Sequence, residues 1–212
     1  MGAIGNYTHR ASCKAQLDSK QQEEAVKFLA HFAGDVTQPL HACARDKGGN
    51  DDKIHFGGQS VNFHASWDTN IPEKRISDDF NGDKAAYASH LVQTIKSDSF
   101  PSSKSTWLSG HDVFETKSNG NSLAAIDWAT DSNWYDCNYV WGPFDQDPSQ
   151  DFSQEYYRNV VPVVDIQIAK GGYRLANLLS QIAGTCANGS DKPKPHPKKG
   201  SRRGGRNNAD TQ

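Results

Sequence analysis

The segment that most constrains the fold runs from residue 160 to residue 184 and reads VVPVVDIQIAKGGYRLANLLSQIAG. Its large apolar residues recur every three or four positions, so on a helix they form one stripe that must pack against other elements. The stripe consists of Val163, Ile166, Leu175, Leu178, Leu179 and Ile182. The pattern predicts a long packed helix with Pro162 in its first turn, where a proline removes no helical hydrogen bond.

Three other segments have the same periodicity and are predicted to be helices: 19–33, 84–96 and 122–134. In the first of them, Ser19 is expected to cap the amino-terminal end. Residues 53–63 contain two short runs around Gly57 and Gly58, a pattern typical of a small hairpin. The predicted fold class is therefore mainly α, a helical bundle with one small β-hairpin.

Length and charge restrict the function only weakly. The chain has 212 residues, which suits one domain with a buried core. Its formal net charge of -2 gives no general basic field for nucleic acid, although an enzyme that acts through metal ions does not need one. Neither a membrane span nor the pattern of a signal peptide is visible. Four cysteines and two glycosylation triplets, at Asn6 and Asn188, would suit a secreted protein.

The composition changes at the carboxyl-terminal end. Residues 188–212 contain seven Lys and Arg against two Asp, many Pro and Gly, and no large apolar residue. Such a segment cannot contribute to a core, so we expect a basic disordered tail after a folded domain at 1–187. The simplest interpretation is a solvated extension, and the alternative is weak affinity for phosphate groups.

Two pairs of His and Asp carry the chemistry that the sequence indicates. His31 and Asp35 are four positions apart, as are His64 and Asp68, so on a helix each pair lies on one face. His41 follows the first pair after a turn at Pro39. Imidazole nitrogen and carboxylate oxygen are zinc ligands, and a catalytic zinc has three protein ligands and one open position. His41, His64 and Asp68 could form such a site, whereas hydrogen-bonded structural histidines are the alternative.

The order of several longer blocks is more specific than any single pair. The blocks are AIGNYTHR near the start, then FLAHFAGDVTQPLH, GGN, NFHASWD and DSNWYDC, and finally IQIAKGGYRLANLL. This series closely resembles the zinc-dependent, single-strand-specific nucleases known as nucleases S-one and P-one, over about residues 2 to 183. The resemblance implies a mostly helical bundle of the zinc nuclease and phospholipase C type, with a cluster of three zinc ions at the bottom of a cleft.

The resemblance also implies roles for individual residues. His31 matches a ligand of one zinc in a close metal pair, and Asp35 matches the catalytic carboxylate that bridges that pair. His41, His64 and Asp68 match the three protein ligands of the remaining zinc. The other histidines match no ligand position; they are His9, His55, His90, His111 and His196.

The implied substrates are single-stranded DNA and RNA and 3'-nucleotides, with 5'-phosphate products. Clustered zinc ions provide a nucleophile near neutral pH and compensate the charge that develops on the phosphate. The segment Lys47–Asn50 resembles the base-binding loop of the family, which makes Lys47, Gly48 and Asn50 candidate substrate-binding residues. The alternative for this segment is an ordinary turn before the hairpin. Lys47 stands where an apolar residue packing on the base is expected, so base preference stays open.

The first residues, MGAIGNYTHR, correspond to the middle of the family pattern. The family's amino-terminal tryptophan, two histidines and one aspartate among the zinc ligands precede this point, as do a catalytic aspartate and a base-stacking aromatic residue. We therefore expect the sequence to be the carboxyl-terminal portion of a nuclease domain, with fewer than three zinc ions and weak activity. The partner of Cys137 is expected upstream as well, whereas the pairing of the other three cysteines is open.

The leading functional prediction is a secreted, monomeric zinc-dependent endonuclease that does not bind membranes. A zinc phospholipase C with a related metal cluster is the closest enzymatic alternative, and the match of GGN to a base-binding loop argues against it. The remaining alternative is an inactive remnant of a nuclease that still binds nucleic acid.

Overall fold

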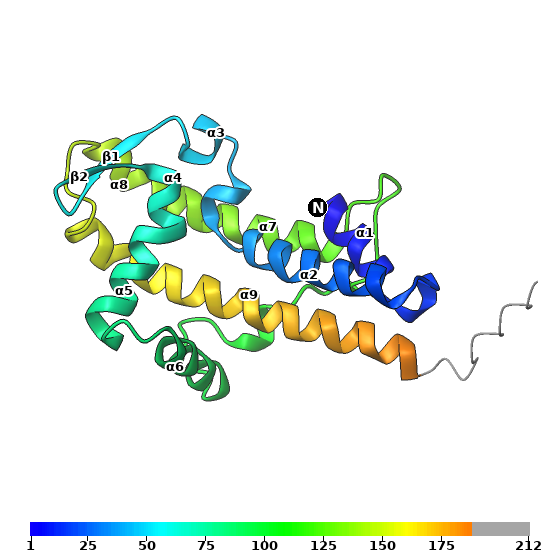
Figure 1. Cartoon of the computed structure of the whole chain (residues 1–212). Helices are drawn as coiled ribbons and strands as arrows, with labels where there is room; N and C mark the ends of the chain where they lie inside the picture. The colour runs from blue at the N-terminus through cyan, green and yellow to red at the C-terminus, as the bar shows by residue number, and fades with distance from the viewer. Residues whose placement is uncertain (188–212) are drawn as a thin grey trace, which may run out of the picture.

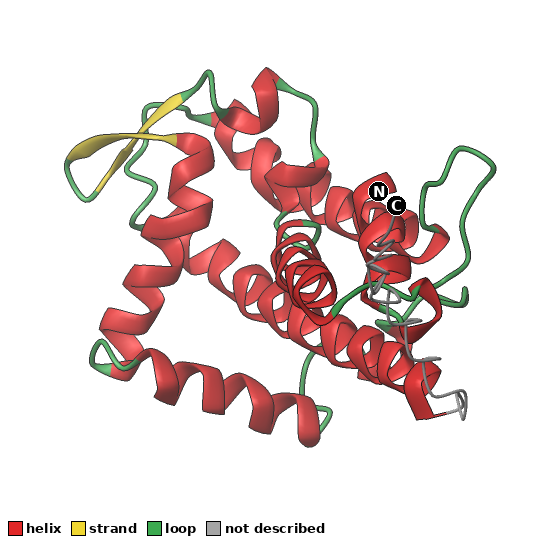
Figure 2. Ribbon diagram, turned by 45° about the vertical axis from the view of Figure 1, so that its right-hand side comes forward, coloured by secondary structure: helices red, strands yellow, loops and turns green. Residues whose placement is uncertain are grey.

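The computed structural model describes residues 1–187, most of which lie in helices (Figure 2). The longer helices are α1 (Gly2–Ala11), α2 (Ser19–Asp35), α5 (Ile71–Phe80), α6 (Lys84–Lys96), α7 (Leu123–Tyr135) and α9 (Glu155–Ala187). The shorter helical segments are η1 (Cys13–Ala15), η2 (Pro39–Ala42), α3 (Asp46–Gly49), α4 (Phe63–Ala65), η3 (Ser66–Asn70), η4 (Lys104–Thr106), η5 (Asp136–Val140) and α8 (Trp141–Gln146). The mainly α fold class is thus confirmed. The predicted tail and the triplet at Asn188 lie outside the described residues.

Helix α9 runs across the molecule, with α1 and α2 packed along its carboxyl-terminal part and α5 against its amino-terminal part (Figure 1). The predicted apolar stripe faces these neighbours, since Val163, Ile166, Leu178 and Ile182 are all buried. At about 25 cal/mol per Å² of apolar surface, burial of this stripe is a major favourable term for the fold.

The predicted start of α9 was wrong. The helix begins at Glu155, so Pro162 lies in its interior and not in its first turn. The residues before the proline remain helical because Tyr156 and Val160 are buried in the apolar cluster near the hairpin. Burial of these side chains outweighs the one backbone hydrogen bond that an interior proline removes.

Helix α2 agrees with the predicted segment but differs at both ends. Asp18, and not Ser19, is the cap residue, because its carboxylate accepts a hydrogen bond of 2.9 Å from the backbone nitrogen of Gln21. The helix also continues two residues beyond Ala33, as far as Asp35. Its buried face contains Ala25, Leu29 and Ala33.

The predicted hairpin is present. Strands β1 (Lys53–Phe56) and β2 (Gln59–Asn62) pair antiparallel, with Phe56 opposite Gln59. The turn between them consists of Gly57 and Gly58, both with positive φ, which glycine adopts without steric cost. Because β2 leads directly into α4, the hairpin sets where that helical segment begins.

The fold shows which of the four cysteines are paired. Cys13 of η1 and Cys186 of α9 form a disulfide across a sequence separation of 173 residues. Among residues 1–187, Cys43 and Cys137 are free. Cys137 is therefore unpaired within the described chain, as the resemblance implied.

An ion cluster joins α7 to α9. The buried Lys170 and Arg174 both contact Asp131, at 2.7 Å each. Arg174 also donates a hydrogen bond of 2.9 Å to the carbonyl oxygen of Trp107. Two buried cations thus share one carboxylate, and desolvation lowers the pKa of Lys170 and of Arg174 despite this partner.

Replacing Asp131 by alanine should destabilise the fold by about 3 kcal/mol, because it leaves two buried cations without a carboxylate. Urea unfolding followed by circular dichroism measures this loss. Asp78→Ala is the matched control: it breaks the more exposed Lys74–Asp78 pair, and it should change stability by less than about 1 kcal/mol. Equal effects of the two substitutions would contradict the structural importance of the buried cluster.

None of the helices in residues 1–187 combines the length and the apolar character needed to cross a lipid bilayer.

Candidate metal centre

The first predicted pair of ligands lies at the carboxyl-terminal end of α2. His31 and Asp35 are one turn apart, and 3.2 Å separates His31 Nε2 from Asp35 Oδ2. Because Leu29 and Ala33 are buried on the other side of the helix, α2 presents this pair at its accessible side. The His31 side chain is the more exposed of the two, at 69% against 36%.

The chain leaves α2 through a turn that α9 holds in place. The Thr37 hydroxyl donates a hydrogen bond of 2.7 Å to the carbonyl oxygen of Gly34, and Gln167 of α9 donates one of 2.7 Å to the carbonyl oxygen of Thr37. Gly171 allows this approach, because a Cβ atom there would lie 3.1 Å from Thr37 Oγ1. The direction of the chain after α2 therefore depends on packing against α9.

The following turn brings His41 back toward α2. Pro39 begins η2, and the side-chain oxygen of Gln38 accepts a hydrogen bond from the Leu40 nitrogen. Leu40 is almost completely buried and anchors the turn in the core. His41, next in sequence, lies with its Nδ1 atom 3.8 Å from Asp35 Oδ1.

The second predicted pair follows the hairpin. Asn62 at the end of β2 caps α4, since its side-chain oxygen accepts a hydrogen bond of 2.9 Å from the Ala65 nitrogen. His64 lies on α4 and Asp68 on the π-helical segment η3, which continues directly into α5. Short π-helical segments within longer helices are frequent at functional sites. His64 Nε2 and Asp68 Oδ2 are 3.3 Å apart.

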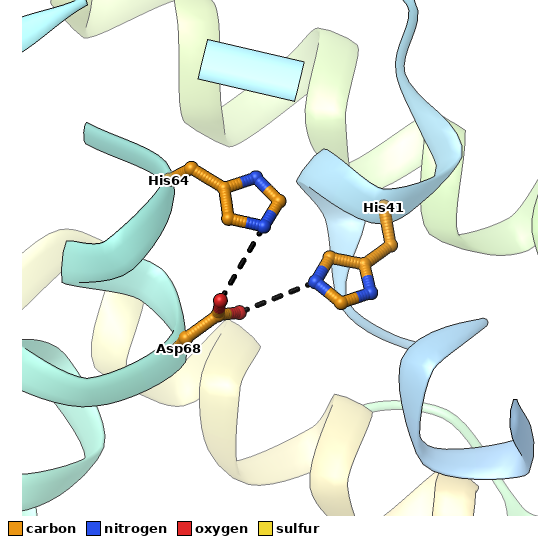
Figure 3. Close-up of side chains that lie close together, drawn as sticks. All are labelled: His41, His64 and Asp68. Carbon is orange, nitrogen blue, oxygen red and sulfur yellow. Dashed lines mark ion pairs between the residues drawn. The ribbon is translucent and has the colours of Figure 1, made fainter. Parts of the chain in front are cut away.

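His41, His64 and Asp68 converge from these two parts of the chain (Figure 3). One ligand atom from each lies within 4.8 Å of the others, and His41 Nε2 is 3.3 Å from Asp68 Oδ1. The two imidazole rings are stacked nearly parallel, with centroids 4.8 Å apart. Zinc–ligand bonds of about 2 Å would place three such atoms at comparable separations around one ion.

His64 forms a hydrogen bond through Nδ1, the ring nitrogen that does not face Asp68, and this bond fixes its tautomer. His64 Nδ1 lies 2.7 Å from the carbonyl oxygen of Gly48, which can only accept. The proton is therefore on Nδ1, and in the neutral ring the lone pair of Nε2 faces the Asp68 carboxylate. A backbone carbonyl in this position is a common second partner of a metal-binding histidine.

The electrostatics of Asp68 also suit a cation. Partial burial by itself would raise the pKa of Asp68, but hydrogen bonds from His41 and Gln38 together lower it below its ordinary value. The same hydrogen bond with Asp68 raises the pKa of His41, in opposition to partial burial. Gln38 Nε2 donates to Asp68 Oδ1 at 2.9 Å. The carboxylate is thus held in its charged form.

These observations fit a zinc ion. A neutral His64 nitrogen and a carboxylate oxygen are both acceptors, so their separation of 3.3 Å is favourable only with a cation or a proton between them. Two histidines and one aspartate form a donor set that zinc accepts, with one position left for water or substrate.

All five predicted ligands lie in one connected group. His31 contacts Asp35, Asp35 contacts His41, and His41 contacts Asp68. His41 therefore connects the two predicted pairs, through Asp35 of the first and Asp68 of the second. The role of Asp35 as a carboxylate that bridges two metal ions stays a prediction, as does metal binding by His31.

An open pocket of about 420 Å³ lies beside the group, and Asp35, His41 and His64 contribute to its wall. Lys47 and apolar residues complete this wall; the apolar residues are Met1, Ala3, Ile4, Phe32, Val36, Leu40 and Cys43. A smaller pocket of about 170 Å³ includes Asp35, His41 and Asp68 in its wall. The candidate ligands are thus accessible from pockets that they line themselves.

The predicted substrate-binding loop adjoins the same site. Lys47 lines the larger pocket, and its ammonium group pairs with Asp51 at 2.9 Å. Gly48 provides the carbonyl oxygen that contacts His64. The Asn50 amide donates a hydrogen bond of 2.9 Å to the Lys47 carbonyl oxygen, so this side chain stabilises the loop internally.

Two partners of the site were missed by sequence reasoning. Gln38 contacts Asp68 from a turn thirty residues earlier, and the Gly48 carbonyl contacts His64. Every residue has a backbone carbonyl, so the residue type at position 48 does not indicate that its carbonyl contacts His64. For Gln38, the only indication in the sequence is its position next to Pro39. Of the remaining histidines, His111 forms a separate i,i+4 pair with Glu115 at 3.0 Å.

Comparison with known proteins shows the family of the chain. Residues 1–184 match the model of the family described as S1/P1 nuclease. The chain belongs to the S1/P1 nuclease family. The resemblance and the helical fold that it implied are therefore confirmed, and the match favours a nuclease over a protein of the phospholipase C type.

Individual relatives of the S1/P1 nuclease family cover most of the chain. Nuclease P1 of Penicillium citrinum is 38% identical over 187 residues, 87% of this chain and 67% of that protein. Nuclease S1 of Aspergillus oryzae is 36% identical, over 86% of this chain and 62% of its own length. Endonuclease 2 of Arabidopsis thaliana is 32% identical, over 86% and 61%. The chain thus spans roughly two thirds of the length of these relatives.

Loss of a residue that only orients a metal ligand weakens metal binding by about 10- to 100-fold. Because His64 is itself a candidate ligand, His64→Ala should weaken zinc binding by more than this. Competition with a chromogenic chelator measures the zinc Kd. His111→Ala is the matched control, since His111 is also in an i,i+4 pair with an acid but outside the group of three. Equal losses in both variants would contradict the assignment.

Proposed function

We propose that this member of the S1/P1 nuclease family is a zinc-dependent endonuclease that hydrolyses phosphodiester bonds of single-stranded DNA and RNA. The proposal extends to 3'-nucleotides as substrates and to products with 5'-phosphates. The observation that carries it is the convergence of His41, His64 and Asp68, each of which lines one or both of two pockets that share Asp35 and His41. We further propose that the protein is secreted and acts as a monomer.

The proposed roles of the individual residues follow from their positions in the site. His41, His64 and Asp68 would hold a zinc ion, which when bound would supply Lewis acidity toward the phosphate group. Asp35, which contacts both His31 and His41, is the proposed catalytic carboxylate and, with His31, the proposed ligand of further zinc. The hydrogen bond from His64 to the Gly48 carbonyl keeps the Nε2 atom directed at the site.

Single-strand preference follows from the position of the loop. The proposed base-binding residues Lys47, Gly48 and Asn50 adjoin the metal ligands, so a base that reaches the loop places its phosphate near them. A paired base would first have to leave its stack, which costs a few kcal/mol. Unpaired strands avoid this cost, so they should be cleaved in preference.

The test is to assay the purified chain on single-stranded DNA, on a duplex of the same sequence and on phosphatidylcholine. We expect cleavage of the single strand, loss of cleavage with a chelator, and recovery with added zinc. Mass spectrometry of the products should find 5'-phosphates. Hydrolysis of phosphatidylcholine would favour the phospholipase alternative, and zinc binding without cleavage would indicate an inactive remnant.

Lys47 should contribute to the electrostatic part of substrate binding. In Lys47→Asn, which removes the charge but tolerates the positive φ of this position, the slope of log binding constant against log salt for a single-stranded oligonucleotide should become less steep by about 0.7, the value for one phosphate contact. Fluorescence anisotropy in chelator, which prevents cleavage, measures this slope. The control is Lys27→Asn, because Lys27 is similarly exposed and also has an i,i+4 acid partner. An unchanged slope in Lys47→Asn would exclude a phosphate contact.

A further inference from the structure

The four residues of α3, between η2 and β1, form a left-handed turn and not a regular α-helix. Asp46, Lys47, Gly48 and Gly49 have φ values of 47°, 55°, 69° and 78°. Glycine adopts this conformation freely, but Asp46 and Lys47 do so only against steric cost. Such a turn persists only where contacts with the rest of the fold stabilise it. Non-glycine residues with positive φ are concentrated at ligand-binding sites.

The turn determines where one oxygen atom of the site lies. The Gly48 carbonyl oxygen accepts the hydrogen bond from His64 Nδ1. Gly48 is also packed against the preceding turn, since a Cβ atom there would lie only 2.4 Å from the Leu40 carbonyl oxygen. A change in the left-handed turn would therefore move the group that orients His64.

Arg45 attaches the turn to a distant part of the fold. Its carbonyl oxygen accepts hydrogen bonds from the nitrogens of Gly48 and Gly49, at 2.7 and 3.2 Å. Its guanidinium lies over the Trp141 ring, 4.0 Å from the centroid. It also donates two hydrogen bonds to Asp145, at 2.9 and 2.6 Å. Trp141 and Asp145 both belong to α8.

The two hydrogen bonds from Arg45 to Asp145 form a planar fork that only an arginine side chain can make. A bidentate pair with a carboxylate combined with stacking on an indole fixes both the position and the plane of the guanidinium. Trp141 is buried in the apolar cluster that includes Leu40 and Phe63, next to η2 and α4. Arg45 therefore connects the left-handed turn to the same core that positions His41 and His64.

We propose that Arg45 is a positioning residue for the metal centre: it holds the left-handed turn against α8, so that the Gly48 carbonyl keeps His64 oriented with Nε2 toward Asp68. Arg45 acts through Gly48 and contacts neither metal nor substrate. The predicted effect of Arg45 on metal binding rests on the proposed zinc site. The predicted effect of Arg45 on the orientation of His64 does not depend on zinc. The competing interpretation is an ordinary partly exposed ion pair, which would affect stability slightly and zinc binding not at all.

The experiment compares Arg45→Met and Arg45→Lys with a matched control, Lys74→Met. Lys74 likewise combines an ion pair, with Asp78, and an aromatic face, that of Tyr157, but contacts no part of the site. Chelator competition should give a zinc Kd about 10-fold weaker in Arg45→Met. Arg45→Lys should be weakened as well, because lysine retains the charge but not the fork. The control should bind zinc as the unmodified protein does.

A second readout uses the zinc-free protein. Ring-nitrogen chemical shifts from NMR report whether the His64 proton is on Nδ1, and this tautomer should be dominant in the unmodified protein and less populated in Arg45→Met. If the unmodified protein binds no zinc but this shift occurs, the positioning role stands and the proposed zinc site fails. Wild-type zinc affinity and an unchanged His64 tautomer in a folded Arg45→Met would overturn the inference.

Asp145→Asn keeps the inference testable if Arg45→Met does not fold. It leaves Arg45 on the Trp141 ring and removes both the charge of the partner and one of its two acceptor oxygens. We expect a weaker zinc Kd in this variant at an unchanged melting temperature. An unchanged Kd would again overturn the role of Arg45.

Discussion

The packing of α9 against the end of α2 is the constraint on which the metal centre depends. At Gly171, α9 lies so close to the turn after α2 that a Cβ atom would be 3.1 Å from Thr37 Oγ1, and Gln167 of α9 donates a hydrogen bond of 2.7 Å to the Thr37 carbonyl oxygen. Gln167 also donates to the Ser132 hydroxyl, which in turn donates to the Val36 carbonyl at 2.6 Å. Backbone oxygens after α2 are thereby fixed by buried hydrogen bonds, which are costly to leave unsatisfied. Because His41 comes only four residues after Thr37, its place depends on α9.

The second half of the centre depends on local geometry after the hairpin. The two-glycine turn sets the register of β1 and β2, and Asn62 then starts α4 in a fixed direction. His64 is oriented by the left-handed turn through the Gly48 carbonyl. The site thus combines a helix end held by α9 with a helix start held by the hairpin, and both lie on elements anchored in the core. Such support limits the movement of the side chains that would hold a metal ion.

The sequence alone predicted the elements well where periodicity decides them. Helix α6 spans the predicted segment, and the hairpin and α7 differ from prediction by one residue at most at each end. The start of α9 was mispredicted because Tyr156 and Val160 are buried by distant partners, and local pattern contains no information on those partners. The same reason explains the missed roles of Gln38 and the Gly48 carbonyl, which become visible only after the two ligand pairs have been brought together.

We propose that His41, His64 and Asp68 hold one zinc ion between the end of α2 and the start of α5. Anomalous diffraction at the zinc edge, from a crystal of this chain grown with zinc, locates the ion. The expected result is an anomalous peak within about 2.0–2.2 Å of a nitrogen of each histidine and an oxygen of Asp68. A peak at other side chains, such as His111 and Glu115, with none between His64 and Asp68, would contradict it.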